Sequence, residues 1–149
     1  MKKIILIMSV VMVSMFTQAF ADKGKEKEVS QQATASFTKD FTAATGVNWE
    51  QYKNYVKVTF TLNGQIMFAY YNNESGHLMA VARNILSDQL PINLMTSFKK
   101  DYSAYWISDL FEMASEGQTS YYATLHNANE TVILKSAGAE WNVYKTERK

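Results

Sequence analysis

The chain contains nearly the same six residues twice, and this internal repeat constrains its architecture more than any other sequence feature. Residues 36–41 read SFTKDF and residues 97–102 read SFKKDY, a displacement of 61 positions in a chain of 149 residues. A helix-like stretch ends on each copy, and a series of short strand-like stretches follows it. Such a period indicates two copies of one supersecondary unit. We therefore expect a helix followed by a set of strands, twice.

Each copy contains the apolar stripe of an amphipathic helix. In the first, residues four apart are apolar, and Gly46 is predicted to cap the C-terminal end of the helix. The second helix is predicted to begin near Leu90-Pro91, because the first turn does not need the N–H group that proline lacks. The predicted stripes are Val29, Ala33, Phe37 and Phe41 in the first helix, and Leu94, Met95, Phe98 and Tyr102 in the second.

Short stretches of alternating or β-rich character predict about four strands after each helix. Turn residues such as Asn63-Gly64, which suits a two-residue type I′ hairpin, separate them. Links this short join antiparallel neighbours. The predicted fold is α+β, with two tandem α-β4 repeats that form one antiparallel sheet and place both helices on one face. The predicted strands lie at about 47–49, 56–62, 66–71, 78–83, 105–113, 119–126, 131–135 and 140–145.

The first 21 residues have the features of a signal peptide. Lys2 and Lys3 precede an apolar run over residues 4–16, and Ala19-Phe20-Ala21 is a small-x-small cleavage site. The apolar run is shorter than the roughly 20 residues that span a bilayer. We therefore expect export to the periplasm or the extracellular space, with cleavage after Ala21. A charged leader (22–28) is predicted to precede a single domain (29–149), whose repeats cover about 29–85 and 86–149.

Composition excludes several function classes. The chain has no Cys, and therefore neither a disulfide nor a thiolate metal site. Without Lys2 and Lys3, 13 of the 15 basic residues remain against 14 acidic residues, so the formal net charge of the exported chain is −1. No basic stripe is present, so we expect neither nucleic acid nor an anionic membrane as a partner, and no membrane insertion after signal removal.

Residues suited to catalysis are few. His77 follows a turn glycine and His126 ends a strand, and we interpret both as surface histidines rather than members of a Ser-His-Asp triad or a metal site. Asp109 and Glu112 are predicted to point to opposite faces of a strand, at a solvated strand end, and Glu116 lies in the following turn. We expect no enzyme activity, no catalytic residue, no metal and no cofactor.

Aromatic residues are more numerous than two helix stripes can use: three Trp, nine Tyr and eight Phe. Tyr70-Tyr71 and Tyr121-Tyr122 are adjacent on predicted strands, so each pair should place one ring under the helices and one on the opposite face of the sheet. We call this face, which the helices leave uncovered, the bare face. Tyrosine is a favoured interface residue because it combines apolar area with a polar tip. The bare-face rings either recognise a partner or merely coat a solvated sheet.

The predicted hairpin at Asn63-Gly64 identifies the bare face. If its loop has two residues, Leu62 pairs with Gln65, and the register places Lys57, Phe68 and Tyr70 away from the helices. We predict these three residues as the centre of a partner-binding surface. A three-residue loop with a bulge would instead shift the register by one residue and turn Phe68 into the core.

Several features recur in one known family of domains: Phe37 and Phe41, Trp49, Val58-Thr59-Phe60, Asn63-Gly64, Tyr71 with Gly76 five residues on, and Leu90-Pro91. In these features the chain resembles the PepSY-like domain of exported Bacteroidetes proteins, also described as β-lactamase-inhibitor-like. The resemblance spans the mature chain and implies two α-then-β4 units, in a family whose members are mostly of unknown function. Its inhibitor name is a structural analogy to a protein with disulfides, so inhibition of a β-lactamase is not carried over to this cysteine-free chain.

Two function classes remain open. The first is a non-enzymatic exported binding module that recognises a periplasmic or extracellular protein or peptide through the open sheet face, including recognition as an inhibitor. The second is a small-molecule or ion-binding protein of the cell envelope, with its ligand between sheet and loops. An open concave face with exposed rings favours the first class, and an enclosed apolar pocket favours the second.

Overall fold

The structure of this protein is a computed structural model that describes residues 28–149. The predicted signal peptide (1–21) and all of the predicted leader except Glu28 lie outside the described residues. Within residues 28–149, no helix has the length and apolar character needed to span a membrane.

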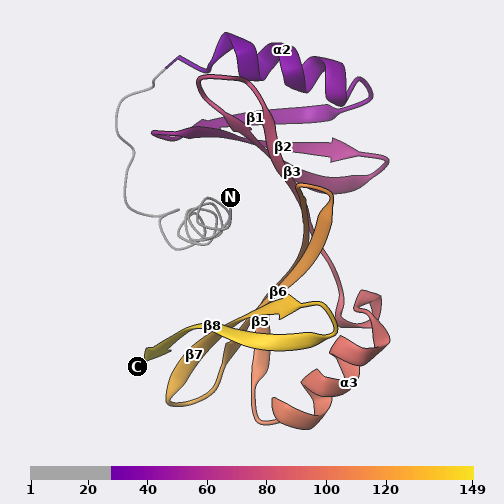
Figure 1. The fold of residues 1–149 in the computed structure, drawn as a ribbon, viewed down its shortest axis with the longest axis vertical. Helices are drawn as coiled ribbons and strands as arrows, with labels where there is room; N and C mark the ends of the chain where they lie inside the picture. Colours follow the sequence, from indigo (N-terminus) through magenta and orange to yellow (C-terminus); the bar gives the residue numbers. More distant parts are fainter. Residues whose placement is uncertain (1–27) are drawn as a thin grey trace.

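One continuous sheet contains all eight strands of residues 28–149, in the order of the sequence. Every strand is antiparallel to the next, which confirms the predicted α+β fold with a meandering sheet (Figure 1). The short turns between strands explain this order, because they can only join antiparallel neighbours. The strands are β1 (Thr45–Gln51), β2 (Tyr55–Leu62), β3 (Gln65–Asn72), β4 (Leu78–Asn84), β5 (Trp106–Ser115), β6 (Gln118–His126), β7 (Glu130–Ala137) and β8 (Glu140–Arg148).

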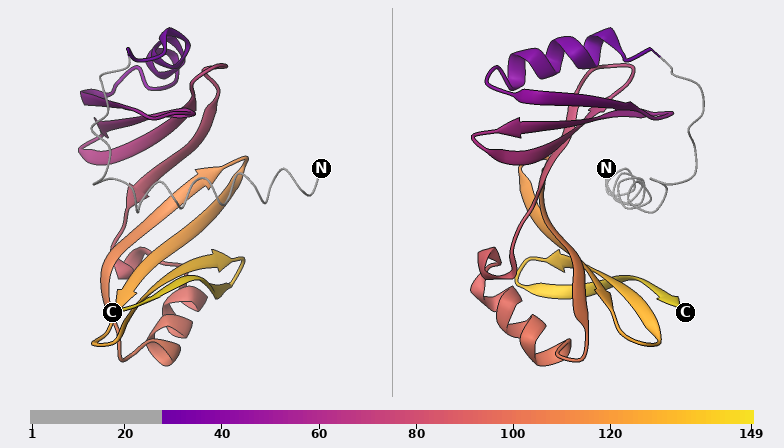
Figure 2. Two further views of the ribbon diagram at one scale, coloured as in Figure 1. Left: turned by 90° about the vertical axis from the view of Figure 1, so that its left-hand side faces the viewer. Right: turned by 180° about the vertical axis from the view of Figure 1, so that it is seen from behind.

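Two helices of ten residues each, α2 (Gln31–Asp40) and α3 (Ile92–Asp101), precede the two groups of four strands. Their first residues are 61 positions apart, the period of the sequence repeat. A short 3₁₀ helix, η1 (Ser87–Gln89), leads into α3. Figures 1 and 2 show the sheet bent into an arc with both helices on its outer, convex side. The inner, concave side carries no helix of the described residues.

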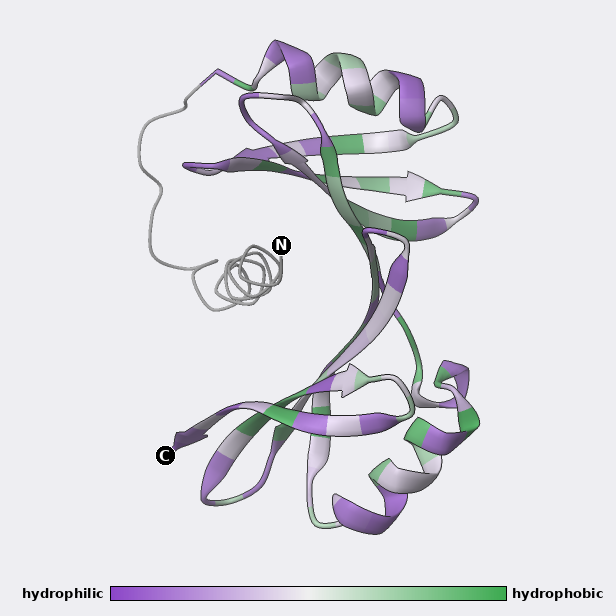
Figure 3. Cartoon of the chain, in the orientation of Figure 1, coloured by the Kyte–Doolittle hydropathy of each residue, from purple (hydrophilic) through white to green (hydrophobic). Residues whose placement is uncertain are grey.

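Each helix packs on its own half of the sheet. Under α2, the Phe37 ring lies 5.2 Å from Trp49 and 5.0 Å from Phe60, measured between ring centroids, and all three belong to one apolar cluster with Val58 and Ala69. The cluster under α3 has Leu110, Ala123, Leu125 and Leu134 at its centre. Hydrophobic and hydrophilic residues accordingly alternate along the strands (Figure 3). The helices are therefore held by two separate convex cores.

The end of the first helix differs from the prediction. Ser30 caps its start, since the Ser30 hydroxyl accepts a bond from the Ala33 N–H at 3.4 Å. The helix ends at Asp40, and the C-cap residue is Phe41, whose N–H donates to the Phe37 carbonyl at 2.9 Å. Gly46 is therefore not the helix cap. It lies in β1 with a φ of +60°, beside a register shift between β1 and β2, where a bulge needs a left-handed residue.

β4 joins the two halves of the sheet. Its residue Ala80 pairs with Tyr70 of β3, and its last residue, Asn84, pairs with Phe111 of β5. Ala80 and Ala82 lie on the concave side and are buried. Small side chains on the inner side of a bend leave room for the larger rings of both neighbouring strands. The sheet can therefore curve strongly at β4.

Candidate functional site on the concave face

The hairpin between β2 and β3 has the predicted register. Asn63 and Gly64 have φ angles of +51° and +79°, and Leu62 pairs with Gln65. Further along, Thr59 pairs with Phe68 and Lys57 pairs with Tyr70. Because Val58 and Ala69, their sequence neighbours, belong to the core under α2, these pairs lie on the concave face. The structure thus brings Lys57, Phe68 and Tyr70 together on the side without helices.

An aromatic cluster, which we call the concave cluster, spans this face from β2 to β6. Tyr52 and Tyr55 stack with ring centroids 4.5 Å apart, and Phe111 and Tyr122 stack at 4.9 Å. Such offset aromatic contacts add stability beyond the area they bury. The cluster consists of Tyr55, Tyr70, Ala80, Ala82, Phe111, Met113 and Tyr122, with Tyr52, Phe68, Met79 and Tyr144 packed at its margin.

Tyr70 lies on the predicted face but is not available there. Its exposed fraction is 1%, and its ring centroid lies 6.2 Å from that of Tyr55. Burial raises the pKa of the Tyr70 phenol, and neighbouring groups that include Tyr55 and Glu50 raise it further. The sequence predicts the face on which Tyr70 lies. Its ring is buried because neighbouring side chains pack closely around it on the inside of the curved sheet. Tyr70 can support a binding surface, but it cannot form the outer layer of one.

Phe68 and Lys57 form an accessible part of the concave face. Both are half-buried, and the Lys57 ammonium lies 5.3 Å from the centre of the Phe68 ring. The Glu50 carboxylate contacts Lys57 at 3.1 Å and accepts a hydrogen bond of 3.0 Å from the Tyr52 hydroxyl. This chain of four side chains, which we call the Lys57 ladder, crosses β1, β2 and β3. It combines apolar rings with a fixed pair of charges.

Two further lysines cover rings toward the other end of the concave face. The Lys135 ammonium lies 5.4 Å from the centre of the Tyr122 ring, and that of Lys149 lies 5.3 Å from the Trp106 ring. Lysine over an aromatic face is attracted by the ring quadrupole. Lys135 forms no ion pair within residues 28–149. The concave face therefore presents cations beside aromatic surface in both halves.

The adjacent tyrosine pairs are divided between the faces as predicted. Tyr71 belongs to the core under α2, where its hydroxyl donates to Asp40 at 3.0 Å, while Tyr70 belongs to the concave cluster. Likewise Tyr121 packs toward the core under α3 and Tyr122 lies in the concave cluster.

His126 was predicted to be a surface histidine, but in the structure it is half-buried and hydrogen-bonded. Its Nε2 lies 2.7 Å from the Ser108 hydroxyl, and its Nδ1 lies 2.7 Å from the Thr131 hydroxyl. Ser108 occupies the register shift between β5 and β6, and bulges can redirect a side chain in this way. Sequence reasoning missed Ser108, since residues 18 positions apart carry no shared motif. In a catalytic triad a carboxylate orients the histidine, whereas here a hydroxyl occupies that position.

The acidic residues of β5 point to opposite faces, as predicted. Glu112 pairs with Arg83 at 3.3 Å, and its strand neighbour Met113 belongs to the concave cluster, so Glu112 lies on the convex face. Asp109 was predicted at a solvated strand end, but it is half-buried, and burial raises the pKa of its carboxyl group. A half-buried carboxylate is a feature that the sequence does not reveal.

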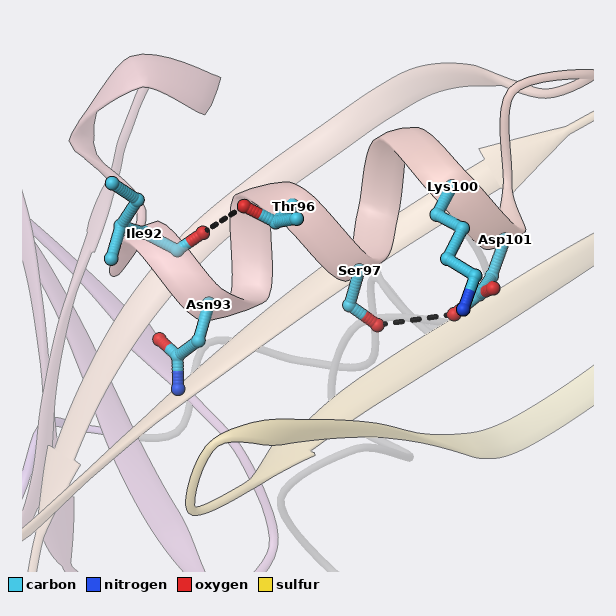
Figure 4. Close-up of a pocket in the computed structure, with 6 residues that line it drawn as sticks. All are labelled: Ile92, Asn93, Thr96, Ser97, Lys100 and Asp101. Carbon is cyan, nitrogen blue, oxygen red and sulfur yellow. Dashed lines mark hydrogen bonds between the residues drawn. The ribbon is translucent and has the colours of Figure 1, made fainter.

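Among the cavities formed by residues 28–149, two lie outside the concave cluster. One of about 390 Å³ is lined by a single face of α3 (Figure 4), where the Thr96 hydroxyl donates to the Ile92 carbonyl and that of Ser97 donates to Asp101. The hydroxyl groups of this cavity are thus partnered within the helix, and the Asn93 amide donates to the Ala139 carbonyl at 3.4 Å. The other, of about 360 Å³, lies where β4 ends beside β5. Within residues 28–149, no group of three His, Cys, Asp or Glu is arranged to hold a metal ion.

Comparisons with known proteins support the fold. A BLIP-like protein from Bacteroides fragilis superposes with a TM-score of 0.67 at 17% identity, covering 82% of this chain and 87% of that one. A DUF2874 family protein from Bacteroides uniformis gives 0.71 at 13% identity, with 81% and 90% covered. A protein provisionally named periplasmic, from Bacteroides eggerthii, gives 0.70 at 13% identity, with 82% and 90% covered. No family model and no curated protein matches the chain.

Proposed function

We propose that this protein is a non-enzymatic, exported binding module that holds a protein or peptide against the concave face of its sheet. The observation that carries this proposal is the Lys57 ladder, in which Phe68 and Lys57 are accessible on a face that no helix of residues 28–149 covers. Aromatic side chains supply much of the binding energy at protein interfaces, whereas lysine is depleted there, so we expect the Phe68 ring to contribute more than the Lys57 ammonium group.

The bent shape of the sheet supports recognition of a large ligand. A concave face that runs over eight strands offers contacts from many positions at once, as a protein or an extended peptide requires. Tyr70 and Phe111 form a rigid floor below the accessible residues because they are buried in the concave cluster. Rigid aromatic surfaces lose little conformational entropy on binding.

Export and family membership belong to the same proposal. Residues 1–21 have the features of a cleaved signal, and one protein of similar fold carries a periplasmic name. The fold shared with a BLIP-like protein supports the inhibitor-like part of the sequence resemblance. We propose the periplasm as the site of action and a BLIP-like relationship by descent, with a target that is specific to this chain.

The second candidate function, binding of a small molecule or ion, has one observation in its favour. The cavity of about 360 Å³ between β4 and β5 falls in the size range of small-ligand sites. Its lining includes the exposed side chains of Leu86 and Ser108. Small-ligand sites bury most of the ligand surface, so we favour the concave face.

Co-purification from the native cell envelope tests the proposal. Tagged protein should retain a stoichiometric partner, and Phe68→Ser should release it while the melting temperature changes little, because Phe68 lies at the margin of the cluster. Val143→Ser is the matched control on the convex side of β8, where Val143 pairs with the core residue Leu134. A partner retained equally by both variants would contradict binding at the concave face.

A further inference from the structure

The first residues of β5 have an open backbone edge. β4 ends at Asn84 opposite Phe111, and the Ile85 N–H still donates to the Leu110 carbonyl at 3.0 Å. β5 itself begins at Trp106. On the side of β4, no strand of residues 28–149 therefore lies beside β5 at residues 106–109. An unpaired strand edge is a template for an additional extended segment.

A cavity lies along this edge. It measures about 360 Å³ and is bounded by the chain that leaves β4 on one side and by β5 on the other. The chain turns away from the sheet after Ile85 into η1, so the space that a longer β4 would fill is open. The lining residues are Asn84, Ile85, Leu86, Ser87, Ile107, Ser108, Asp109 and Leu110.

Asp109 supplies an uncompensated negative charge in this cavity. Its carboxylate is half-buried, and it forms no ion pair with a basic residue of the described chain. Burial raises the pKa of Asp109, and a bond from the Leu110 N–H lowers it in part. A partly desolvated carboxylate gains most from a cationic partner that brings hydrogen-bond donors. The site is therefore complementary to a basic side chain.

Exposed apolar side chains flank the same end of the sheet. Because β4 is antiparallel to both neighbours, its last residue, Asn84, lies near the start of β3 and opposite Phe111, five residues after the start of β5. Ile66 near the start of β3, Leu86 just after β4 and Trp106 at the start of β5 are 58%, 69% and 56% exposed. Exposed large apolar side chains near an open strand edge are available for contact with a bound segment.

We propose that this edge binds an extended peptide segment with a lysine or arginine side chain, whose backbone pairs with β5 at residues 106–109 and whose cation contacts Asp109. Leu86 and Trp106 contact the apolar residues on either side of that cation. The inference rests on the proposed function, because it names the chemical class of the segment that the concave face receives. Phe111 and Asp109 share one side of β5, so the edge is continuous with the concave cluster.

Fluorescence anisotropy with three capped hexapeptides tests this inference on the mature protein. The first alternates threonine and valine around one lysine, the second has norleucine in place of lysine, and the third has the lysine sequence with N-methylated backbone amides. The lysine peptide should bind at least about tenfold more tightly than either of the others, because each lacks one of the two contacts. Equal affinities for the lysine and norleucine peptides, or no binding of any peptide, would overturn the inference.

Two variants locate the site. Asp109→Asn keeps the shape of the side chain and should remove the preference for the lysine peptide. Glu116→Gln, in the turn at the other end of β5, is the control and should leave that preference unchanged. Asp109→Asn removes a half-buried charge, so it should fold at least as stably as the natural chain. Should it fail to fold, Leu86→Ser changes an exposed side chain and must weaken the lysine peptide at least about threefold. A lysine preference that survives Asp109→Asn, or an affinity for the lysine peptide that survives Leu86→Ser, would overturn the inference.

The result is distinguishable from a failure of the proposed function. If Phe68→Ser releases the native partner but the peptides show no lysine preference, binding at the concave face is supported and peptide binding at the β5 edge is rejected. If Phe68→Ser keeps the native partner and the lysine preference depends on Asp109, peptide binding at the β5 edge is supported. The Lys57 ladder is then rejected as the binding centre.

Discussion

The ammonium group of Lys57 lies 5.3 Å from the centre of the Phe68 ring, across the concave face from β2 to β3. The Glu50 carboxylate, on β1, holds the same ammonium group at 3.1 Å. Lys57 is thus fixed between a carboxylate and a ring, both on the side of the sheet without helices. This arrangement gives the open face a polar and an apolar component in one place.

Replacing Lys57 should affect partner binding more than folding. Lys57→Met keeps most of the aliphatic stem over Phe68 but removes the charge, so the free energy of unfolding should change by less than about 1 kcal/mol. Binding of the partner should weaken, as measured by calorimetry or co-purification. Arg83→Met removes the cation of the convex ion pair with Glu112 and is the matched control. Equal binding by the two variants would argue against a role for the Lys57 ladder.

Truncation of the two repeated phenylalanines should have unequal effects. Phe37 is buried among Trp49 and Phe60, so Phe37→Ala should lower the free energy of unfolding by about 3–5 kcal/mol. Phe98 is only half-buried against Trp141, so Phe98→Ala should cost roughly half as much. Urea unfolding followed by tryptophan fluorescence measures both. Equal losses would show that the two repeats share one packing scheme despite their different burial.

Among the glycines of residues 28–149, Gly76 should be the least tolerant of a side chain. It has a φ of +65°, and a Cβ atom at this position would lie 2.7 Å from the backbone of Gln32 at the start of α2. Gly76→Ala should therefore combine backbone strain with a clash and cost about 2–5 kcal/mol. Gly64→Ala has a similar φ of +79° and open space around the new methyl group, so it should cost about 1–2 kcal/mol. Thermal melts in which both variants lose the same stability would refute the close approach of Gly76 to α2.

Stability should fall at alkaline pH. Burial is the main cause that raises the pKa of Tyr70 and of Tyr71, and for Tyr71 the bond to Asp40 adds to it. Above about pH 10, where tyrosine in the unfolded chain ionises, the native chain holds more protons than the unfolded chain. The free energy of unfolding therefore decreases as pH rises through this range and is unaffected by these groups below it.

Denaturant unfolding between pH 7 and 11 measures this decrease, and Tyr70→Phe and Tyr71→Phe should each make the pH profile flatter. Tyr144→Phe is the control at the margin of the concave cluster, where the phenol is only half-buried. A profile that stays unchanged in both of the first two variants would contradict the burial of these phenols.

The sequence predicted most of the fold because its signals are local. The spacing of Ala33 and Phe37 indicates a helix, and the alternation from Val56 to Leu62 indicates a strand, so the eight strands and two helices were all expected. Asn63-Gly64 also determined the register of β2 and β3. Gly46 was misread as a helix cap, because a positive-φ glycine serves a bulge equally well.

The site was less accessible to sequence reasoning, since it depends on curvature and on contacts between distant strands. Register places Phe68 and Tyr70 on one face, but only the bend of the sheet makes Tyr70 buried and Phe68 accessible. Asp109 lies at an open strand edge because β4 stops at Asn84, and a pattern of alternating residues does not reveal where a neighbouring strand ends. Ser108 contacts His126 at the register shift between β5 and β6, which the sequence does not show either.

Site-specific photo-crosslinking in the cell envelope tests the central claim most directly. Ile66 lies two residues before Phe68 on the concave side of β3, Val143 lies on the convex side of β8, and both are 58% exposed. A photoreactive phenylalanine at position 66 should form a discrete adduct with a partner protein or peptide upon irradiation, and the same group at position 143 should not. Adducts of equal yield at both positions, or an adduct at position 143 alone, would contradict binding at the concave face.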